Sequence, residues 1–365
     1  MMDPMQTTQH KSAARFLAEV LVVSYMGAVA LAAHLTGIHL LLFPELAALS
    51  HDVMTRPQGK WASQPGRIVL TPTLTAAVGL FATRHTHYGA ISIALIVLAS
   101  LVIIKLLGSA IGPALSAGAL PMVLGERSWM YPAAIFLGLT GLVAILWIWQ
   151  RYGPRFGPPS RYSRNDSDVI NELESAPHSR FWVVTLLAFV LLLGVPAQFT
   201  GLRFILFPPL IVMAYELFGH PEIPGWMERP ALFPLVCVLT ASVGVIACHM
   251  CRSSVVGVML TVLCSIAILR AFKVHMPPAL AVGLLPFVMT APNMRYAISV
   301  GIGTVALTLC FCCCGSLRKI SARMANQIGA ANQWKATPQN EDFTGADSLS
   351  ISGESAQPRK RIKHV

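Results

Sequence analysis

Positively charged side chains beside long apolar stretches are the residues of this sequence with the clearest potential for chemistry. His39 and Lys105 lie in the first half of the chain, and Arg203 and Arg270 lie in the second half. A charged group at the centre of a bilayer costs at least ~2.5 kcal/mol, so its presence there calls for a function or a partner. These cations could bind a small anion inside a membrane. Alternatively, each side chain snorkels to the membrane surface and only anchors its helix.

A short helix is expected to follow Lys105 and another to follow Arg270. Proline is tolerated in the first turn of a helix, so these helices should begin at Pro113 and Pro278. A helix N-terminus carries about +0.5 charge and free N–H donors, and half-helices of this kind form anion sites in transporters. We therefore expect a binding site for a small anion. Its candidate residues are Arg270, Lys105, Arg203, His39, Lys273, His275, Pro113 and Pro278.

The composition places these residues in an integral membrane protein. Of the 365 residues, 55% are hydrophobic and 12% are charged, and the mean hydropathy is +0.62. Soluble domains carry about 25% charged residues. A disordered protein is excluded, and so is a soluble enzyme, which would have to expose large apolar patches. The sequence contains no phosphate-binding loop, HExxH motif or nucleophile elbow. It thus predicts no enzyme, no cofactor and no metal site.

The cations occupy equivalent places because the sequence repeats itself. The segment Thr36-Gly37-Ile38-His39 reappears as Thr200-Gly201-Leu202-Arg203, at an offset of 164 (200 − 36). From Trp61 and Trp226 onward the offset is 165 (226 − 61), and the same offset relates Lys105 to Arg270. A register kept through roughly 100 residues indicates an internal duplication.

Each copy predicts the same set of helices. Four segments per copy approach the ~20 apolar residues that a transmembrane helix needs. They are 16–35, 68–82, 90–104 and 129–149 in the first copy, and 181–199, 232–247, 254–269 and 295–314 in the second. Pro or Gly interrupts the shorter segments 40–49, 108–124, 204–218 and 274–289, and polar loops are expected at 50–67 and 219–230. The sequence therefore predicts an all-α, polytopic transmembrane helical bundle of two tandem parallel repeats.

Charge patterning divides the chain and orients it. We predict an N-terminal cytoplasmic arm (1–15), membrane repeat 1 (16–149), a polar linker (150–180), membrane repeat 2 (181–314) and a disordered basic C-terminal tail (315–365). The arm, linker and tail carry excess Lys and Arg, which places all three in the cytoplasm. Each copy then crosses an even number of times: four if the short segments are re-entrant, six if they span. An odd count would give inverted repeats. A bacterial inner membrane is favoured because no transit peptide is evident.

Other ionisable or reactive side chains lie near the apolar segments. Glu19, Glu45 and Glu216 could carry protons for coupled transport, but ordinary interfacial positions are the simpler interpretation. Cys248 and Cys251 have redox-like spacing without the βαβ context of a redox domain. Nucleic acid is not an expected partner, because the basic runs lack interleaved aromatic residues. The expected partners are a small anion and membrane lipids, and a homo-oligomer is compatible with the sequence.

Two segments of the second copy carry a family resemblance. The runs Phe204-Ile-Leu-Phe-Pro-Pro209 and Val274-His-Met-Pro-Pro-Ala-Leu-Ala281 resemble the HPP family of integral membrane proteins, which is named for a His-Pro-Pro motif. This chain has Met276 between His275 and Pro277, and the first copy has Ala110-Ile-Gly-Pro113 instead. Plant members are associated with nitrite transport into plastids. The resemblance therefore implies a small inorganic anion as the substrate.

Transport of a small, nitrite-like anion along the repeat interface is the function that the sequence favours. A membrane scaffold or sensor, acting through its linker and tail without transport, is the alternative. A membrane redox enzyme that uses Cys248 and Cys251 is a third interpretation.

Overall fold

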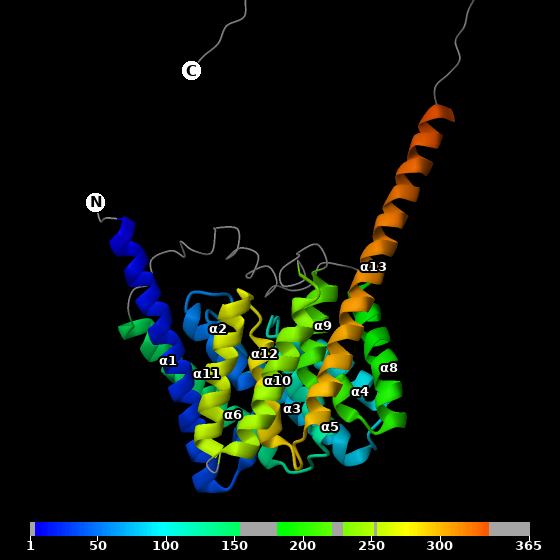
Figure 1. Ribbon diagram of the computed structural model, residues 1–365. Coiled ribbons are helices and arrows are strands. Elements are labelled where there is room, and N and C mark those ends of the chain that lie inside the picture. Colours follow the sequence, from blue (N-terminus) through cyan, green and yellow to red (C-terminus); the bar gives the residue numbers. More distant parts are fainter. Residues whose placement is uncertain (1–3, 154–180, 221–228, 252–253, 336–365) are drawn as a thin grey trace, which may run out of the picture. The chain divides into compact units, whose positions relative to one another are not determined.

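A computed structural model describes all residues of the chain except 1–3, 154–180, 221–228, 252–253 and 336–365 (Figure 1). Its helices form two matching sets, one from each half of the chain. The first set is α1 (Pro4–Thr36), η1 (His39–Leu41), α2 (Glu45–Thr55), α3 (Pro65–His85), α4 (Ala90–Leu106), α5 (Pro113–Leu124) and α6 (Met130–Tyr152). The second set is α8 (Trp182–Thr200), η2 (Arg203–Leu206), α9 (Pro208–Gly219), α10 (Leu232–Met250), α11 (Ser254–Phe272), α12 (Pro278–Leu284), η4 (Leu285–Val288) and α13 (Met294–Lys335).

Seven helices in the described part of the chain are long and apolar enough to cross a membrane. They are the apolar part of α1 (Ala13–Thr36), α3, α6, α8, α10, α11 and the first part of α13 (Met294–Cys314). The eighth expected span, α4, has 17 residues, which is about the shortest length that spans a bilayer. The predicted all-α, polytopic membrane bundle is confirmed, and the chain is a multi-pass membrane protein.

The duplication extends from the order of the helices to individual hydrogen bonds. In the first copy the Tyr131 hydroxyl donates to the Ala117 carbonyl oxygen at 2.8 Å. In the second copy the Tyr296 hydroxyl donates to the Val282 carbonyl oxygen at 2.7 Å. Both bonds are buried, and both partners differ by the same 165 residues (296 − 131 and 282 − 117). The two copies therefore share one packing scheme.

We expect Tyr131→Phe and Tyr296→Phe to lower the stability of the protein by similar amounts. Each substitution leaves a buried carbonyl oxygen without its donor, at a cost of about 1–3 kcal/mol. Thermal unfolding in detergent, followed by loss of monodisperse protein, measures the effect. Exposed Tyr152→Phe is the control and should unfold like the wild type. A clear cost in only one of the two repeats would contradict the shared packing scheme.

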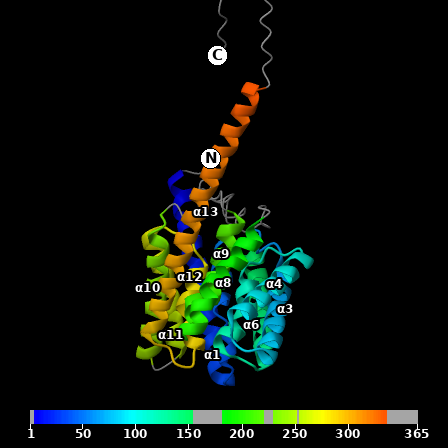
Figure 2. The same cartoon turned by 90° about the vertical axis from the view of Figure 1, so that its right-hand side faces the viewer.

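The two repeats exchange their first helices. Helix α1 packs against α11, and α2 packs against α12 of the second repeat. In the same way α8 packs against α4, and α9 packs against α5 of the first repeat. Figure 1 shows α1 beside α11, and Figure 2 shows the α10–α11 pair and the α3–α4 pair on opposite sides of α8 and α9. The repeats therefore interlock, and their short helices meet in the core.

The short helices take part in the passage of the chain through the bundle. The Trp149 indole near the end of α6 donates to the Met54 carbonyl oxygen near the end of α2 at 3.1 Å, so these two helices end on the same side of the bundle. The Tyr88 hydroxyl, between α3 and α4, lies 3.5 Å from the Arg203 carbonyl oxygen of η2. The chain reaches α3 from α1 by passing through η1 and α2, and both sets of helices follow the same order, as expected for parallel repeats.

One predicted boundary is wrong, and several expectations fall outside the described residues. The polar loop expected from residue 50 onward begins as helix, because α2 continues to Thr55 and buries Ser50, His51 and Asp52. The predicted linker 150–180 and the loop 219–230 are mostly not described. Residues 316–365 form a separate unit. Helix α13 continues into it as far as Lys335, and the remainder of the predicted tail lies outside the described residues.

Candidate functional site

Helix α2 carries three buried ionisable side chains. Glu45, His51 and Asp52 are 2%, 4% and 1% exposed. Side chains of these types are rarely buried so completely unless they are paired. Inside a membrane bundle, such residues mark candidate functional sites. The polar core of this protein therefore lies on α2, where the interlocked repeats meet.

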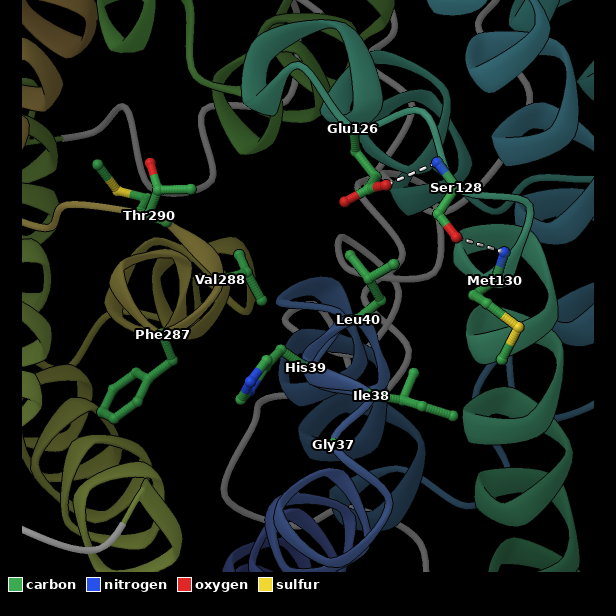
Figure 3. A pocket seen from close by; sticks show the side chains of 11 residues that line it. Gly37, Ile38, His39, Leu40, Glu126, Ser128, Met130, Phe287, Val288 and Thr290 are labelled. Carbon is green, nitrogen blue, oxygen red and sulfur yellow. Dashed lines mark hydrogen bonds between the residues drawn. The ribbon is translucent and has the colours of Figure 1, made fainter.

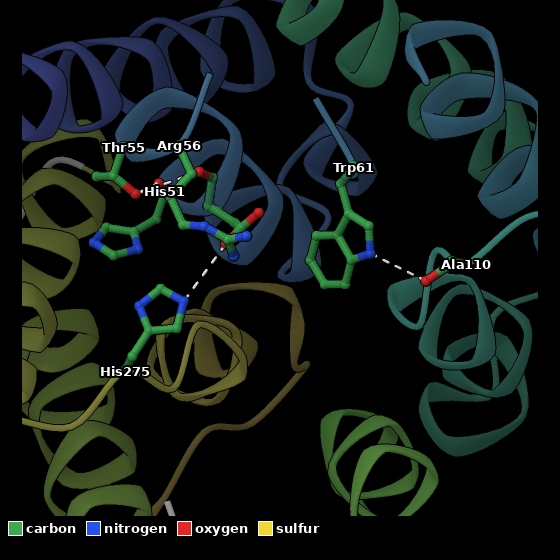
Figure 4. Close-up of polar contacts among 7 residues, drawn as sticks. His51, Thr55, Arg56, Trp61, Ala110 and His275 are labelled. Atoms are coloured by element: carbon green, nitrogen blue, oxygen red, sulfur yellow. Dashed lines mark hydrogen bonds and ion pairs between the residues drawn. The ribbon is translucent and has the colours of Figure 1, made fainter. Parts of the chain in front are cut away.

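Asp52 connects α2 to the segment that precedes α12. Its Oδ1 atom lies 3.2 Å from Nη1 of Arg56 and 3.6 Å from Nε2 of His275. The rings of His51 and His275 are 6.4 Å apart between centroids (Figure 4). Since His275 comes from the second repeat and the other three residues come from the first, this cluster is built by both repeats. We call Asp52, His51, Arg56 and His275 the α2–α12 cluster.

Arg270 lies beside this cluster and is held by an acid of α1. Its Nε atom donates to Glu19 Oε1 at 3.0 Å, and its Nη2 atom contacts Glu19 Oε2. The Nε atom of Arg15 lies 3.4 Å from the same carboxylate. The Glu19 side chain is 7% exposed, whereas that of Arg270 is 43% exposed. His51 interacts electrostatically with both arginines, so the structure brings Arg270 and His275 into one region.

The second repeat contributes an acid at the matching place on α9. The Arg56 N–H closes α2 by donating to the Asp52 carbonyl oxygen, and the His220 N–H closes α9 by donating to that of Glu216. Asp52 and Glu216 are therefore equivalent, at an offset of 164 (216 − 52). Glu216 also interacts electrostatically with Asp52. An acid from each repeat thus faces the place where the interrupted helices meet.

The other predicted cations lie away from the α2–α12 cluster or outside the core. Lys105 is exposed in the last turn of α4, and Lys273 is exposed after α11 with a positive φ of 55°. The exposed Arg203 lies at the start of η2, with its guanidinium 4.7 Å from the centre of the Tyr88 ring. Burial raises the pKa of Tyr88, which lies between α3 and α4, to about 12, and Arg203 opposes this shift. Of the eight predicted residues, only Arg270 and His275 therefore meet around His51.

The expected helix starts are both present. Helix α5 begins at Pro113 and α12 begins at Pro278, and both prolines are buried. Helix α12 has only seven residues before it continues as η4. Each start lies opposite a helix of the other repeat, because α5 packs against α9 and α12 packs against α2.

His39 lines a pocket that is separate from the α2–α12 cluster. The pocket has a volume of about 530 Å³, and its walls come from η1, the α5–α6 loop and the end of η4. Figure 3 shows His39, Glu126 and Thr290 around the opening. The Glu126 carboxylate accepts hydrogen bonds from the main-chain N–H groups of Arg127 and Ser128. None of the residues of the α2–α12 cluster lines this pocket.

In the core, acidic side chains lie closer to the cations than the sequence predicted. Arg15, Arg270 and Asp52 interact electrostatically with His51. Glu19 pairs with both of these arginines, and Asp52 pairs with Arg56. Sequence reasoning missed His51 and Asp52 because they fell in an expected polar loop; the Asp52–Arg56 spacing of four residues was the available signal for a helix.

Comparison of the chain with protein-family models, with curated proteins and with solved structures found no match.

Proposed function

We propose that this membrane protein transports a small inorganic anion through the interface of its two repeats. One observation carries the proposal: the interrupted helices α2, α5, α9 and α12 pack against one another in the core and hold buried ionisable residues. Transporters commonly place their binding sites at repeat interfaces, between broken helices. Such residues are costly in a membrane core and accompany ion or proton pathways.

An anion is the substrate that best fits the charges near this interface. Arg270 presents a partly exposed guanidinium beside the α2–α12 cluster. A guanidinium binds planar oxyanions through two parallel hydrogen bonds. The resemblance to the HPP family points to the same class of substrate, nitrite in particular. Arg270 would bind the anion with the donors that Glu19 does not occupy.

Nitrite uptake into proteoliposomes tests this function. We expect Arg270→Gln to lower uptake by about tenfold or more, because it removes the charge that binds the anion. The same change also removes a partner of buried Glu19, so the double variant Glu19→Gln/Arg270→Gln is needed to separate binding from stability. It should restore thermal stability without restoring uptake.

Arg67→Gln is a matched control, because Arg67 is exposed at the start of α3 and donates to Gln64. Its uptake should equal that of the wild type. Wild-type uptake by the double variant would show that Arg270 serves only as the ion-pair partner of Glu19. Failure of the wild type to take up nitrite, chloride or nitrate would contradict anion transport itself.

A further inference from the structure

Glu45 is a buried carboxyl group with one oxygen atom unused. It is the first residue of α2, seven residues and about 10 Å along the helix before Asp52. The Ser116 hydroxyl of α5 donates to Glu45 Oε1. The other oxygen, Oε2, is buried and has no hydrogen-bond partner among the described residues. Glu45 belongs neither to the α2–α12 cluster nor to the contacts of Arg270.

The helices packed around α2 bring no positive charge to Glu45 in the described part of the chain. The titratable groups near it are hydroxyls: Tyr131 of α6 and Tyr296 of α13 interact with it electrostatically, and both donate to main-chain oxygens instead. On α1, the Tyr25 hydroxyl donates to the Gly138 carbonyl oxygen, and Glu19 is paired with arginines. Helix α12 has no titratable residue. Among the described residues, Glu45 therefore faces no cationic side chain, and its own main-chain N–H at the start of α2 is a further hydrogen-bond donor to its carboxyl group.

An ionised carboxylate in these surroundings would be very unfavourable. Burying a charge without a partner costs several kcal/mol, and such a group takes up a proton instead. A neutral carboxyl fits the geometry, because Oε1 accepts from Ser116 and Oε2 can hold the proton. Glu45 is thus a protonated acid in this conformation.

The second repeat shows that the fold does not need a polar pair at this place. The residue equivalent to Glu45 is Pro209 (209 − 45 = 164), and the residue equivalent to Ser116 is Ala281 (281 − 116 = 165). Both are buried, at the start of α9 and within α12. The second repeat therefore packs with apolar residues at both of these places. Packing alone does not explain the Glu45–Ser116 pair, so we infer that the pair has another role.

We propose that Glu45 is the proton-binding site of the transport cycle, so that the anion moves together with a proton. The proton leaves Oε2 for water when α2 and α5 separate toward one side of the membrane. It is replaced from water on the other side, and one proton crosses per cycle. This inference rests on the proposed anion transport for its coupling, but not for the protonation of Glu45.

Labelling with dicyclohexylcarbodiimide tests the protonated state without any transport assay. A protonated carboxyl adds to the carbodiimide, and the adduct rearranges to a stable N-acylurea that peptide mass spectrometry detects. We expect labelling of Glu45 in liposomes at mildly acidic pH, with Ser116→Ala retaining it and Glu45→Gln lacking it. Glu126 is the internal control, since it lines a pocket and its carboxylate already accepts hydrogen bonds from two main-chain N–H groups. Labelling of Glu45 that is equal to or weaker than the labelling of Glu126 would overturn the assignment.

Flux measurements test the coupling. We expect Glu45→Gln to keep exchange of labelled nitrite across the membrane but to lower accumulation driven by a pH gradient by about tenfold. Its thermal stability should match the wild type, because Gln resembles the neutral acid. If nitrite uptake by the wild type does not depend on the pH gradient, proton coupling is overturned, whereas the proposed anion transport is not. Absence of all anion flux would contradict the proposed function, while the labelling would still decide whether Glu45 binds a proton.

Discussion

Gly79→Ala is expected to prevent the assembly of a stable bundle. A Cβ atom at Gly79 of α3 would overlap the carbonyl oxygen of Gly118 in α5. Both groups belong to helix backbones, so a rotamer change cannot relieve the overlap and the two helices must separate. Overpacking typically costs about 1–3 kcal/mol, and the cost here lies at or above the upper end of this range because neither backbone can move aside alone. The duplication predicts the same outcome for Gly244→Ala, whose Cβ atom would overlap the carbonyl oxygen of Gly283.

The yield of monodisperse protein in detergent and its thermal unfolding measure this effect. Gly66→Ala is the matched control, because Gly66 also lies in α3 and a Cβ atom there would meet nothing within 4 Å. We expect Gly66→Ala to behave like the wild type or slightly better, since alanine favours helix. Wild-type yield and stability of Gly79→Ala would show that α3 and α5 are not in this close contact.

Asp52→Ala is expected to have the second large effect on stability. Asp52 is the buried acid between Arg56 and His275, and the Arg56 side chain is itself only 15% exposed. Removing one member of a buried ion pair costs about 3–5 kcal/mol, because the remaining charge loses its partner in a medium of low dielectric constant. Both repeats contribute to this contact, so the loss should also loosen α12 from α2.

A double variant separates the charge effect from the packing effect. Asp52→Asn/Arg56→Gln removes both charges while keeping similar shapes, and we expect it to recover most of the stability that Asp52→Ala loses. Thermal unfolding in detergent and limited proteolysis near residue 275 report the two effects. An Asp52→Ala variant as stable as the wild type would show that this ion pair is not important for the fold.

Local signals in the sequence predicted much of the architecture. The apolar spans, the duplication and the helix starts at Pro113 and Pro278 follow from hydropathy, register and the fixed φ of proline. The extension of α2 through His51 and Asp52 could not be predicted in this way. A polar stretch normally indicates a loop, and here its residues are buried because partners from other helices satisfy them.

Hydropathy and the repeat register along the chain establish a duplicated, helical membrane protein with interrupted helices at equivalent places. The tertiary structure shows which charges meet. Arg270 is paired with Glu19, 251 residues away, because the repeats exchange their first helices and α1 packs against α11. It also showed that Glu45 and Ser116 form a buried pair with no polar equivalent in the second repeat. Spacing along one helix is a local property, whereas the partner of a buried charge depends on which helices pack together.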